Sequence, residues 1–238
     1  MDVIVASSDH EMVSARRFGY PVFSEPTPRE ASGKIVLRWG NSFAPRYISE
    51  INPKHAIATN VNKFAARRMI GSVCRTPKTY EPGSTVEDNM IVIARPTSHS
   101  AGYSFRVKIG PVTLGGEEYA TQALTPTKEY RVWFDIQRRT MVGRRAPMSD
   151  KPEQAAEALK PFPCRSKWGY EWISSPDAPL TTMCKQAADA IGLDMGAGDF
   201  LLYDGKYYCL ELNSAPSLDH DRLLTFMKHS VEEYRAQY

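Results

Sequence analysis

The chain has 238 residues, a formal net charge of +3 and a hydrophobic content of 42%. Its length suits one large or two small domains, and its apolar content excludes disorder for the bulk of the chain. The apolar runs are too short to cross a bilayer, and the opening residues differ from a secretory signal. The four cysteines lie scattered without a Cys-x-x-Cys pair, so we expect a cytoplasmic protein with reduced thiols.

The positive charge of the chain is mild and lies partly in pairs of neighbouring arginines. These pairs are Arg16-Arg17, Arg67-Arg68, Arg138-Arg139 and Arg144-Arg145. We interpret each pair as a solvated face. Together they permit, but do not require, an anionic partner such as a nucleotide or a nucleic acid. The five histidines lack the spacing of metal ligands, so no zinc site is expected.

The first 58 residues predict a short α/β unit. Residues 3–6 and 34–39 are β-type runs, and a turn-rich segment with two prolines lies between them. A second unit is expected to start near residues 57–60. Directly after this boundary, Asn62 is a candidate N-cap for a helix that Gly71 can end.

The middle of the chain predicts a β-rich region with loops. Residues 89–108 have the pattern strand, loop, strand, and small residues in the loop would let backbone N–H groups approach phosphate oxygens. Residues 118–142 are also β-rich. A short helix is expected at residues 153–160, and residues 164–179, rich in Trp, Gly and Pro, are expected to be irregular.

The last third of the chain predicts two helices. Residues 181–191 carry an apolar stripe, and Gly192 can close that helix. Ser217 or Asp219 is expected to cap a final helix, whose stripe of Leu, Met, Val and Tyr side chains predicts core packing.

The strongest functional signal comes from Asp199, Glu211 and Asn213. The apolar runs on either side of Asp204-Gly205 predict a β-hairpin. Glu211 and Asn213 are two residues apart, so they share one face of its second strand. Two carboxylates and an amide oxygen suit Mg²⁺, which proteins usually hold with one or two carboxylates while substrate phosphates complete the shell.

The register of this hairpin decides whether Asp199 joins the other two residues. A two-residue turn pairs Tyr203 with Lys206 and points Asp199 away from Glu211. A three-residue loop pairs Tyr203 with Tyr207 and puts Asp199 across from Glu211. We predict the three-residue loop, because a cation between the two acids would offset their repulsion. The alternative is a surface hairpin whose acids are merely solvated.

The order of these segments resembles the ATP-grasp superfamily of carboxylate–amine ligases, which includes D-alanine–D-alanine ligases and ribosomal-protein glutamate ligases. The resemblance covers roughly residues 57–220. Its most specific part is an Asp, a hairpin and then Glu-x-Asn followed by small residues and a proline. In this chain these are Asp199, then residues 211–213 and 214–216.

The resemblance implies an α/β (or α+β) fold in which ATP lies between two antiparallel β-sheets, preceded by a short α/β domain. The expected domains are residues 1–58 and 59–238. Within the second, we expect a small subdomain at about 77–124 and a metal-binding subdomain at about 125–238.

The same resemblance implies which residues bind the nucleotide. Lys63 matches a lysine that neutralises phosphate, and Arg95 stands where the family has a lysine before a proline. The remaining expected contacts are His99, Ser100, Ala101 and Gly102 for phosphate, Gln122, Ala123 and Leu124 for adenine, and Glu129 for the ribose or its surroundings.

Asp199, Glu211 and Asn213 are then expected to hold one or two Mg²⁺ ions, with Mn²⁺ as a substitute. Arg131, Arg144 and Arg145 are implied as the cations that face an acyl phosphate. The family often has an arginine two residues before the metal aspartate, where this chain has Ala197. Either Arg131 or Arg145 takes that role, or the chemistry differs.

The function implied is an ATP-dependent ligase that joins a small-molecule or peptide carboxylate to an amine through an acyl phosphate, with release of ADP and phosphate. Two alternatives remain open at the level of sequence. One is a phosphotransferase on the same scaffold, and the other is a non-catalytic module that binds a nucleotide or a nucleic acid. Neither a membrane partner nor a particular oligomer is predicted.

Overall fold

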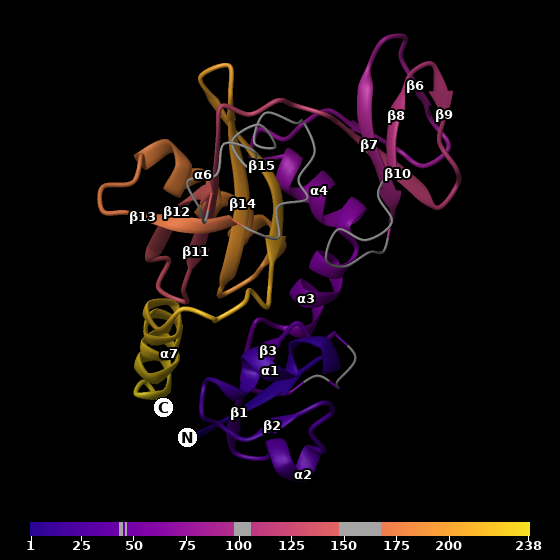
Figure 1. Ribbon diagram of the computed structural model, residues 1–238. Coiled ribbons are helices and arrows are strands. Elements are labelled where there is room, and N and C mark those ends of the chain that lie inside the picture. The colour runs from indigo at the N-terminus through magenta and orange to yellow at the C-terminus, as the bar shows by residue number, and fades with distance from the viewer. Residues whose placement is uncertain (43–44, 46, 98–105, 148–167) are drawn as a thin grey trace.

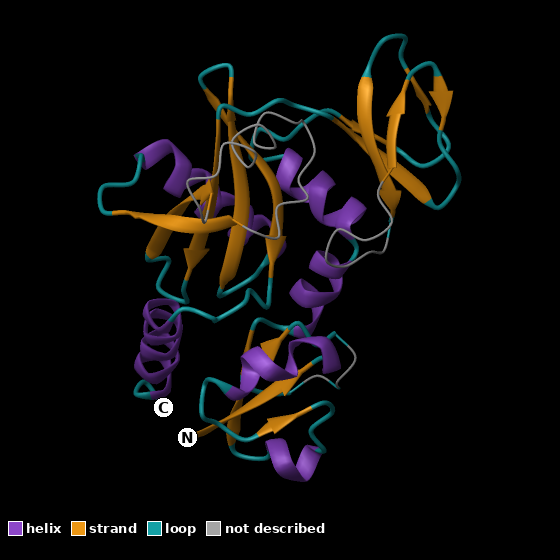
Figure 2. Ribbon diagram, in the orientation of Figure 1, coloured by secondary structure: helices purple, strands orange, loops and turns teal. Residues whose placement is uncertain are grey.

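The computed structural model describes residues 1–42, 45, 47–97, 106–147 and 168–238. These residues form three main β-sheets with helices packed between and around them (Figures 1 and 2). The expected α/β fold, with two antiparallel sheets after a short α/β unit, is confirmed. In the described part of the chain, no helix has the length and apolar content needed to cross a bilayer.

The N-terminal unit is a parallel four-stranded sheet. Its strand order is β2 (Val22–Phe23), β1 (Asp2–Ser7), β3 (Lys34–Trp39) and β4 (Glu50–Ile51). Short helical turns connect the strands: η1 (Asp9–Glu11), α1 (Met12–Arg16) and α2 (Pro28–Ala31). Both strands predicted in this region are present. β1 and β3 are buried almost throughout, as is typical of parallel strands covered on both faces.

Two consecutive helices, α3 (Lys54–Val61) and α4 (Lys63–Gly71), connect this unit to the rest of the chain. The Asn62 side chain accepts a hydrogen bond from the Ala65 N–H at 3.0 Å, so the predicted N-cap is confirmed. The expected boundary between residues 58 and 59 falls inside α3, so the backbone is helical across it.

The small sheet is antiparallel. Its order is β5 (Thr79–Tyr80), β10 (Glu118–Gln122), β7 (Ile91–Pro96) and β8 (Arg106–Ile109). A two-stranded ribbon of β6 (Thr85–Val86) and β9 (Val112–Thr113) extends it. The two strands predicted within 89–108 are therefore present as β7 and β8, and residues 98–105 between them lie outside the described residues. The apolar face of this sheet has a core of its own around Val92 and Ala120.

The large antiparallel sheet has five strands. Its order is β13 (Trp168–Ile173), β12 (Thr140–Pro147), β11 (Lys128–Phe134), β14 (Gly196–Tyr203) and β15 (Lys206–Asn213). The prediction that residues 164–179 are irregular is wrong for β13. Trp, Tyr and Ile favour a strand when a neighbouring strand pairs with them, and β12 does so along its length.

The large sheet is covered on both faces. Helices α3, α4 and α6 (Ala178–Ile191) pack on one face against Val132, Phe134 and Leu212. The other face contributes Trp133 and Ala197 to a second core, shared with the N-terminal sheet and α7 (Asp221–Arg235). Figure 1 shows α7 beside the large sheet and the N-terminal unit, with the two termini near each other.

The predicted end of helix α6 is confirmed, whereas the predicted cap of helix α7 is wrong. Gly192 ends α6 in the left-handed region at φ 80°, as predicted. The N-cap of α7 is His220 and neither Ser217 nor Asp219, because the helix begins at Asp221. His220 Nδ1 accepts from the Arg222 N–H at 3.2 Å. The predicted apolar stripe is core, with Leu223, Met227 and Val231 buried.

The hairpin β14–β15 differs from the prediction in its loop and agrees in its outcome. The turn has two residues, Asp204 and Gly205, both with positive φ, and Tyr203 pairs with Lys206. The register then shifts between Asp199 and Phe200, so that Asp199 nevertheless pairs with Glu211. The predicted three-residue loop is therefore wrong, and a β-bulge supplies the extra residue on β15 instead.

Candidate active site

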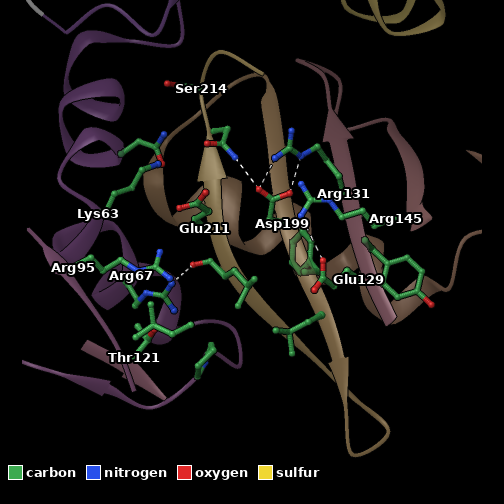
Figure 3. A pocket seen from close by; sticks show the side chains of 18 of the residues that line it. Lys63, Arg67, Arg95, Thr121, Glu129, Arg131, Arg145, Asp199, Glu211 and Ser214 are labelled. Atoms are coloured by element: carbon green, nitrogen blue, oxygen red, sulfur yellow. Dashed lines mark hydrogen bonds and ion pairs between the residues drawn. The ribbon is translucent and has the colours of Figure 1, made fainter. Parts of the chain in front are cut away.

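A cavity of about 510 Å³ lies where the large sheet, the small sheet and the N-terminal unit meet. The small sheet supplies Ile93, Arg95 and Thr121, and α4 supplies Lys63 and Arg67. The large sheet supplies charged, amide and aromatic side chains, namely Glu129, Arg131, Arg145, Tyr170, Asp199, Glu211 and Asn213. Figure 3 shows many of these side chains pointing into a common space.

The three residues predicted to bind a metal lie together on the cavity face of the β14–β15 hairpin. Asp199 is the direct cross-strand partner of Glu211. The Asn213 amide donates to Asp199 Oδ2 at 3.1 Å. Among the described residues, the Glu211 carboxylate has no hydrogen-bond or ion-pair partner, although it is half-buried and faces the cavity. A half-buried carboxylate with free oxygens beside a second carboxylate is a place where a cation would be stabilised.

Asp199 is held from the other side by Arg131. The guanidinium donates from Nε and Nη2 to the two carboxylate oxygens, each at 2.7 Å. Burial would raise the pKa of Asp199, but the Arg131 charge and hydrogen bonds override burial and lower the pKa below its usual 3.8. Asp199 is therefore ionised at neutral pH and remains able to bind a cation.

The neighbouring arginines on β12 have separate environments. Arg145 lines the cavity and lies 3.5 Å from the Glu129 carboxylate, and its buried Nε has no hydrogen-bond partner in the described chain. Arg144 is one residue earlier, so its side chain leaves the opposite face of the strand. There it pairs with Glu171 away from the cavity. The structure thus separates Arg144 from the expected site, because consecutive strand residues face opposite sides.

The other end of the cavity is basic. Lys63 and Arg67, one helical turn apart on α4, both reach across to β15. Lys63 Nζ donates to the Leu212 carbonyl at 2.9 Å, and Arg67 Nη2 donates to the Leu210 carbonyl. Arg95 lies on β7 beside them, and its buried Nε has no partner among the residues described. A ligand with several negative charges would offset this positive charge.

The residues expected to contact adenine connect the small and large sheets. Gln122 is the last residue of β10, and both Gln122 and Leu124 line the cavity. The Ala123 N–H is already used, since it donates to the Ile91 carbonyl at 2.9 Å. Its carbonyl and the Leu124 backbone are the polar groups that this segment can offer. The expected phosphate residues His99, Ser100, Ala101 and Gly102 lie outside the described residues.

The structure adds cavity residues that sequence reasoning missed. Arg67, interpreted as part of a solvated pair, is 4% exposed and lies in the cavity wall. Its position four residues after Lys63 on one helix face was the available signal. Ser8, Glu11 and Gly40 come from the N-terminal unit. No local pattern links that unit to β14 and β15, so only the tertiary structure identifies them.

The fold is that of the ATP-grasp ligases. The structure of D-alanine–D-alanine ligase from Bacillus anthracis is similar with a TM-score of 0.62 and 11% identity, over 100% of this chain and 99% of that one. The ATP-grasp ligase PsnB complexed with a minimal precursor has a TM-score of 0.55 and 14% identity, over 92% of both chains.

A third similar structure is the RiPP-associated ATP-grasp ligase of Chryseobacterium gregarium, in complex with ADP and a leader and core peptide. Its TM-score is 0.56 and its identity 10%, over 98% of this chain and 97% of that one. No protein-family model matches the chain, and no curated protein matches it in sequence. At these identities the likeness shows the shared fold alone.

Proposed function

We propose that the protein is an ATP-dependent carboxylate–amine ligase that forms an amide through an acyl phosphate. The observation that carries the proposal is the direct opposition of Asp199 and Glu211 in the cavity. A basic group with Lys63 and Arg95 lies on one side of this pair, and Arg131 and Arg145 lie on the other. This order suits a triphosphate, a divalent cation and an acyl group in sequence along one cavity.

The donor set fits Mg²⁺, or Mn²⁺ in its place. Within the described ranges, no three His, Cys, Asp or Glu side chains form a metal-binding group, so the protein would contribute few ligands. Glu211, Asp199 and the Asn213 amide oxygen would hold the ion, and phosphate oxygens would complete its shell. The ion would offset charge on the transferring phosphoryl group. The similar PsnB structures include a complex with Mg and ADP, which supports this assignment.

The nucleotide would lie with its base against the segment after β10 and its phosphates towards Lys63 and Arg95. Leu124, 7% exposed, and Ile93, 6% exposed, provide an apolar wall for the base. Glu129, near the start of β11 and 3.5 Å from Arg145, is the proposed ribose contact. A similar structure of the Bacillus anthracis D-alanine–D-alanine ligase is complexed with ATP.

Two bond exchanges make up the proposed reaction. A substrate carboxylate oxygen attacks the γ-phosphorus, the bond to the β-phosphate oxygen breaks, and ADP leaves. An amine nitrogen then attacks the acyl carbon, the carbon–oxygen bond to phosphate breaks, and the amine proton passes to solvent. Positioning and charge neutralisation supply most of the rate in such transfers. Arg145, with Nε free of partners in the described structure, would stabilise the oxyanion of the second step.

Tyr170, Ser214 and Glu11 also line the cavity, and we assign them to the substrate. Both a small amino acid and the end of a peptide are compatible with these polar and aromatic groups. One similar ligase is complexed with a minimal precursor and another with a leader and core peptide, which makes peptides a substrate class to test beside free amino acids.

The test is ADP release with Mg²⁺ over pairs of carboxylates and amines, followed by hydroxylamine trapping. A hydroxamate is expected, because only an acyl phosphate reacts with hydroxylamine in this way. Asp199→Asn and Glu211→Gln should each abolish ADP formation, whereas Asp204→Asn at the exposed hairpin turn should leave it unchanged. ADP formation without hydroxamate would indicate a phosphotransferase, and nucleotide binding without turnover would indicate a non-catalytic module.

A further inference from the structure

Arg67 is the most deeply buried basic side chain of the cavity wall. It is 4% exposed, against an intermediate exposure for Lys63 and Arg95. Its Nη2 donates to the Leu210 carbonyl, while its buried Nη1 has no hydrogen-bond partner among the residues described. Tyr119 also interacts with this guanidinium. A buried guanidinium is normally fully paired, so the Nη1 group lacks a partner that the site would need.

The surroundings of Arg67 favour an anion as that partner. Burial lowers the pKa of Arg67, and the nearby Arg95 charge lowers it further, while Tyr119 and Glu211 oppose these effects. Lys63 lies one turn earlier on the same helix and also lines the cavity. The Glu211 carboxylate alone does not balance these charges. The planar fork of an arginine matches the oxygens of a phosphate better than the point charge of a lysine does.

Leu210, the backbone partner of Arg67, is the extra residue of the β-bulge. Phe200 pairs with Cys209 and Asp199 pairs with Glu211, which leaves Leu210 between two ladder positions. A bulged residue has no cross-strand partner of its own, and here Arg67 binds its carbonyl. The bulge is what brings Glu211 opposite Asp199. One guanidinium therefore contacts both the cavity and the backbone feature that sets the acidic pair.

We infer that Arg67 is a positioning residue with two partners: Nη1 binds a phosphate oxygen of the nucleotide, and Nη2 holds the Leu210 bulge that aligns Glu211 with Asp199. The inference rests on the proposed function for the identity of the ligand. It adds a polyphosphate contact to the nucleotide-binding residues expected from the sequence. It also explains why an arginine, which can bind both partners at once, stands at this buried position.

The experiment measures binding to the 238-residue chain by calorimetry, without Mg²⁺, for tripolyphosphate, ATP and adenosine. The variants are Arg67→Met and Arg67→Lys, and the control is Arg68→Met. Arg68 is the next residue on α4, and it is exposed and makes only a solvent-exposed ion pair with Glu81 at 3.9 Å. The control therefore removes the same charge from the same helix without touching the cavity. Circular dichroism and thermal unfolding report whether each variant is folded.

Arg67→Met should weaken tripolyphosphate and ATP binding by about 10- to 100-fold, the range expected for a lost hydrogen bond to a charged group. Adenosine binding should remain unchanged. Arg67→Lys keeps the charge and should fold even if Arg67→Met does not. It should lose part of the tripolyphosphate affinity, because one ammonium cannot bind both partners. Arg68→Met should bind all three ligands like the unaltered protein.

Three outcomes would overturn the inference. They are unchanged tripolyphosphate binding in the folded Arg67 variants, an equal loss of adenosine and tripolyphosphate binding, and the absence of tripolyphosphate binding to the unaltered protein. Hydroxamate formation with unchanged tripolyphosphate binding in the variants would leave the proposed function standing without this role for Arg67. Selective loss of tripolyphosphate binding without any hydroxamate would leave the role standing without the ligase activity.

Discussion

Arg131 lies directly opposite Asp199 on the neighbouring strands β11 and β14, and its guanidinium binds both carboxylate oxygens at 2.7 Å. Both side chains are about one-fifth exposed, at 21% and 22%. Burial opposes the charge on each group, and each partner's charge overrides that opposition in the pKa of the other. This pair therefore supplies an arginine beside the proposed metal aspartate, a role that Ala197 on β14 cannot fill.

Removing Arg131 is expected to lower the free energy of unfolding more than active-site substitutions usually do. Arg131→Met leaves the Asp199 charge half-buried and unpaired, and breaking a buried pair costs about 3–5 kcal/mol, with the lower end expected here because of the exposure. Urea unfolding measures the change. The double variant Arg131→Met/Asp199→Leu should recover most of the loss. A loss in Arg131→Met as small as that in Arg144→Met, whose pair with Glu171 is more exposed, would contradict the expectation.

Substitutions of the two neighbouring arginines of β12 should have sharply different effects on enzymatic activity. Arg145→Met removes a cation from the cavity wall and is expected to lower kcat for amide formation about 10²- to 10³-fold, as for the loss of one oxyanion donor. Arg144→Met removes the same charge from the outer face and should leave kcat unchanged. Steady-state ADP release and product analysis provide the comparison. Equal effects of the two substitutions would remove Arg145 from the mechanism.

The pair of Glu50 with Arg38 in the N-terminal unit should control stability at neutral pH. The Nη2–Oε1 distance is 2.7 Å, and the side chains are 6% and 0% exposed. Burial would raise the pKa of Glu50, but Arg38 and the N–H groups of Tyr47 and Lys54 lower it below its usual 4.5. Because the folded-state pKa is depressed, the stabilisation is fully present above about pH 4.5 and is lost as the pH falls through the folded-state value.

Glu50→Gln should therefore cost about 3–5 kcal/mol from neutral pH down to about 4.5, and the difference from the unaltered protein should shrink below that pH. Urea unfolding at several pH values measures it. The exposed Glu25→Gln in the same unit serves as the control. A difference for Glu50→Gln that grows as the pH falls would show the sign to be wrong.

Glycine at position 196 is expected to be required for the position of Asn213. A Cβ at this site would lie 2.5 Å from the Asn213 carbonyl oxygen and 3.1 Å from the Phe134 ring. Gly196→Ala should cost about 1–3 kcal/mol through overpacking and should weaken Mg²⁺-dependent nucleotide binding. Gly116→Ala, where nothing lies within 4 Å of the added atom, is the matched control. Urea unfolding and calorimetry should show no change for the control.

The hairpin shows how far local pattern carries. Asp204-Gly205 predicted the turn, and the residues adopt the positive φ values that this dipeptide favours. A cation site shared by the two acids requires Asp199 opposite Glu211, and the structure has that pairing. The predicted three-residue loop was wrong, because the extra residue lies in a bulge on β15 and not in the loop. The spacing of three between the buried Cys209 and Leu212, where a regular strand has two, was the overlooked sign.

The arginines show where local pattern ends. Alternation along β12 separates Arg144 from Arg145, but which of the two faces the cavity depends on which side of the sheet the helices cover. Arg67 has the sequence context of a solvated pair, and its burial arises because α4 packs against β15. Similarly, Trp- and Gly-rich residues after 167 become strand β13 only because β12 offers them a ladder.

The sequence by itself determined most of the longer strands, the helices α4, α6 and α7 with the cap beside Lys63, and a hairpin that carries two acids and an amide. These features depend on neighbours within a few residues, through turn geometry, side-chain periodicity and capping. The tertiary structure alone decided the pairing of Arg131 with Asp199, the burial of Arg67 and the contribution of the N-terminal unit to the cavity. Those relationships join segments more than 60 residues apart, and their energy comes from packing and desolvation, which no local stretch of sequence specifies.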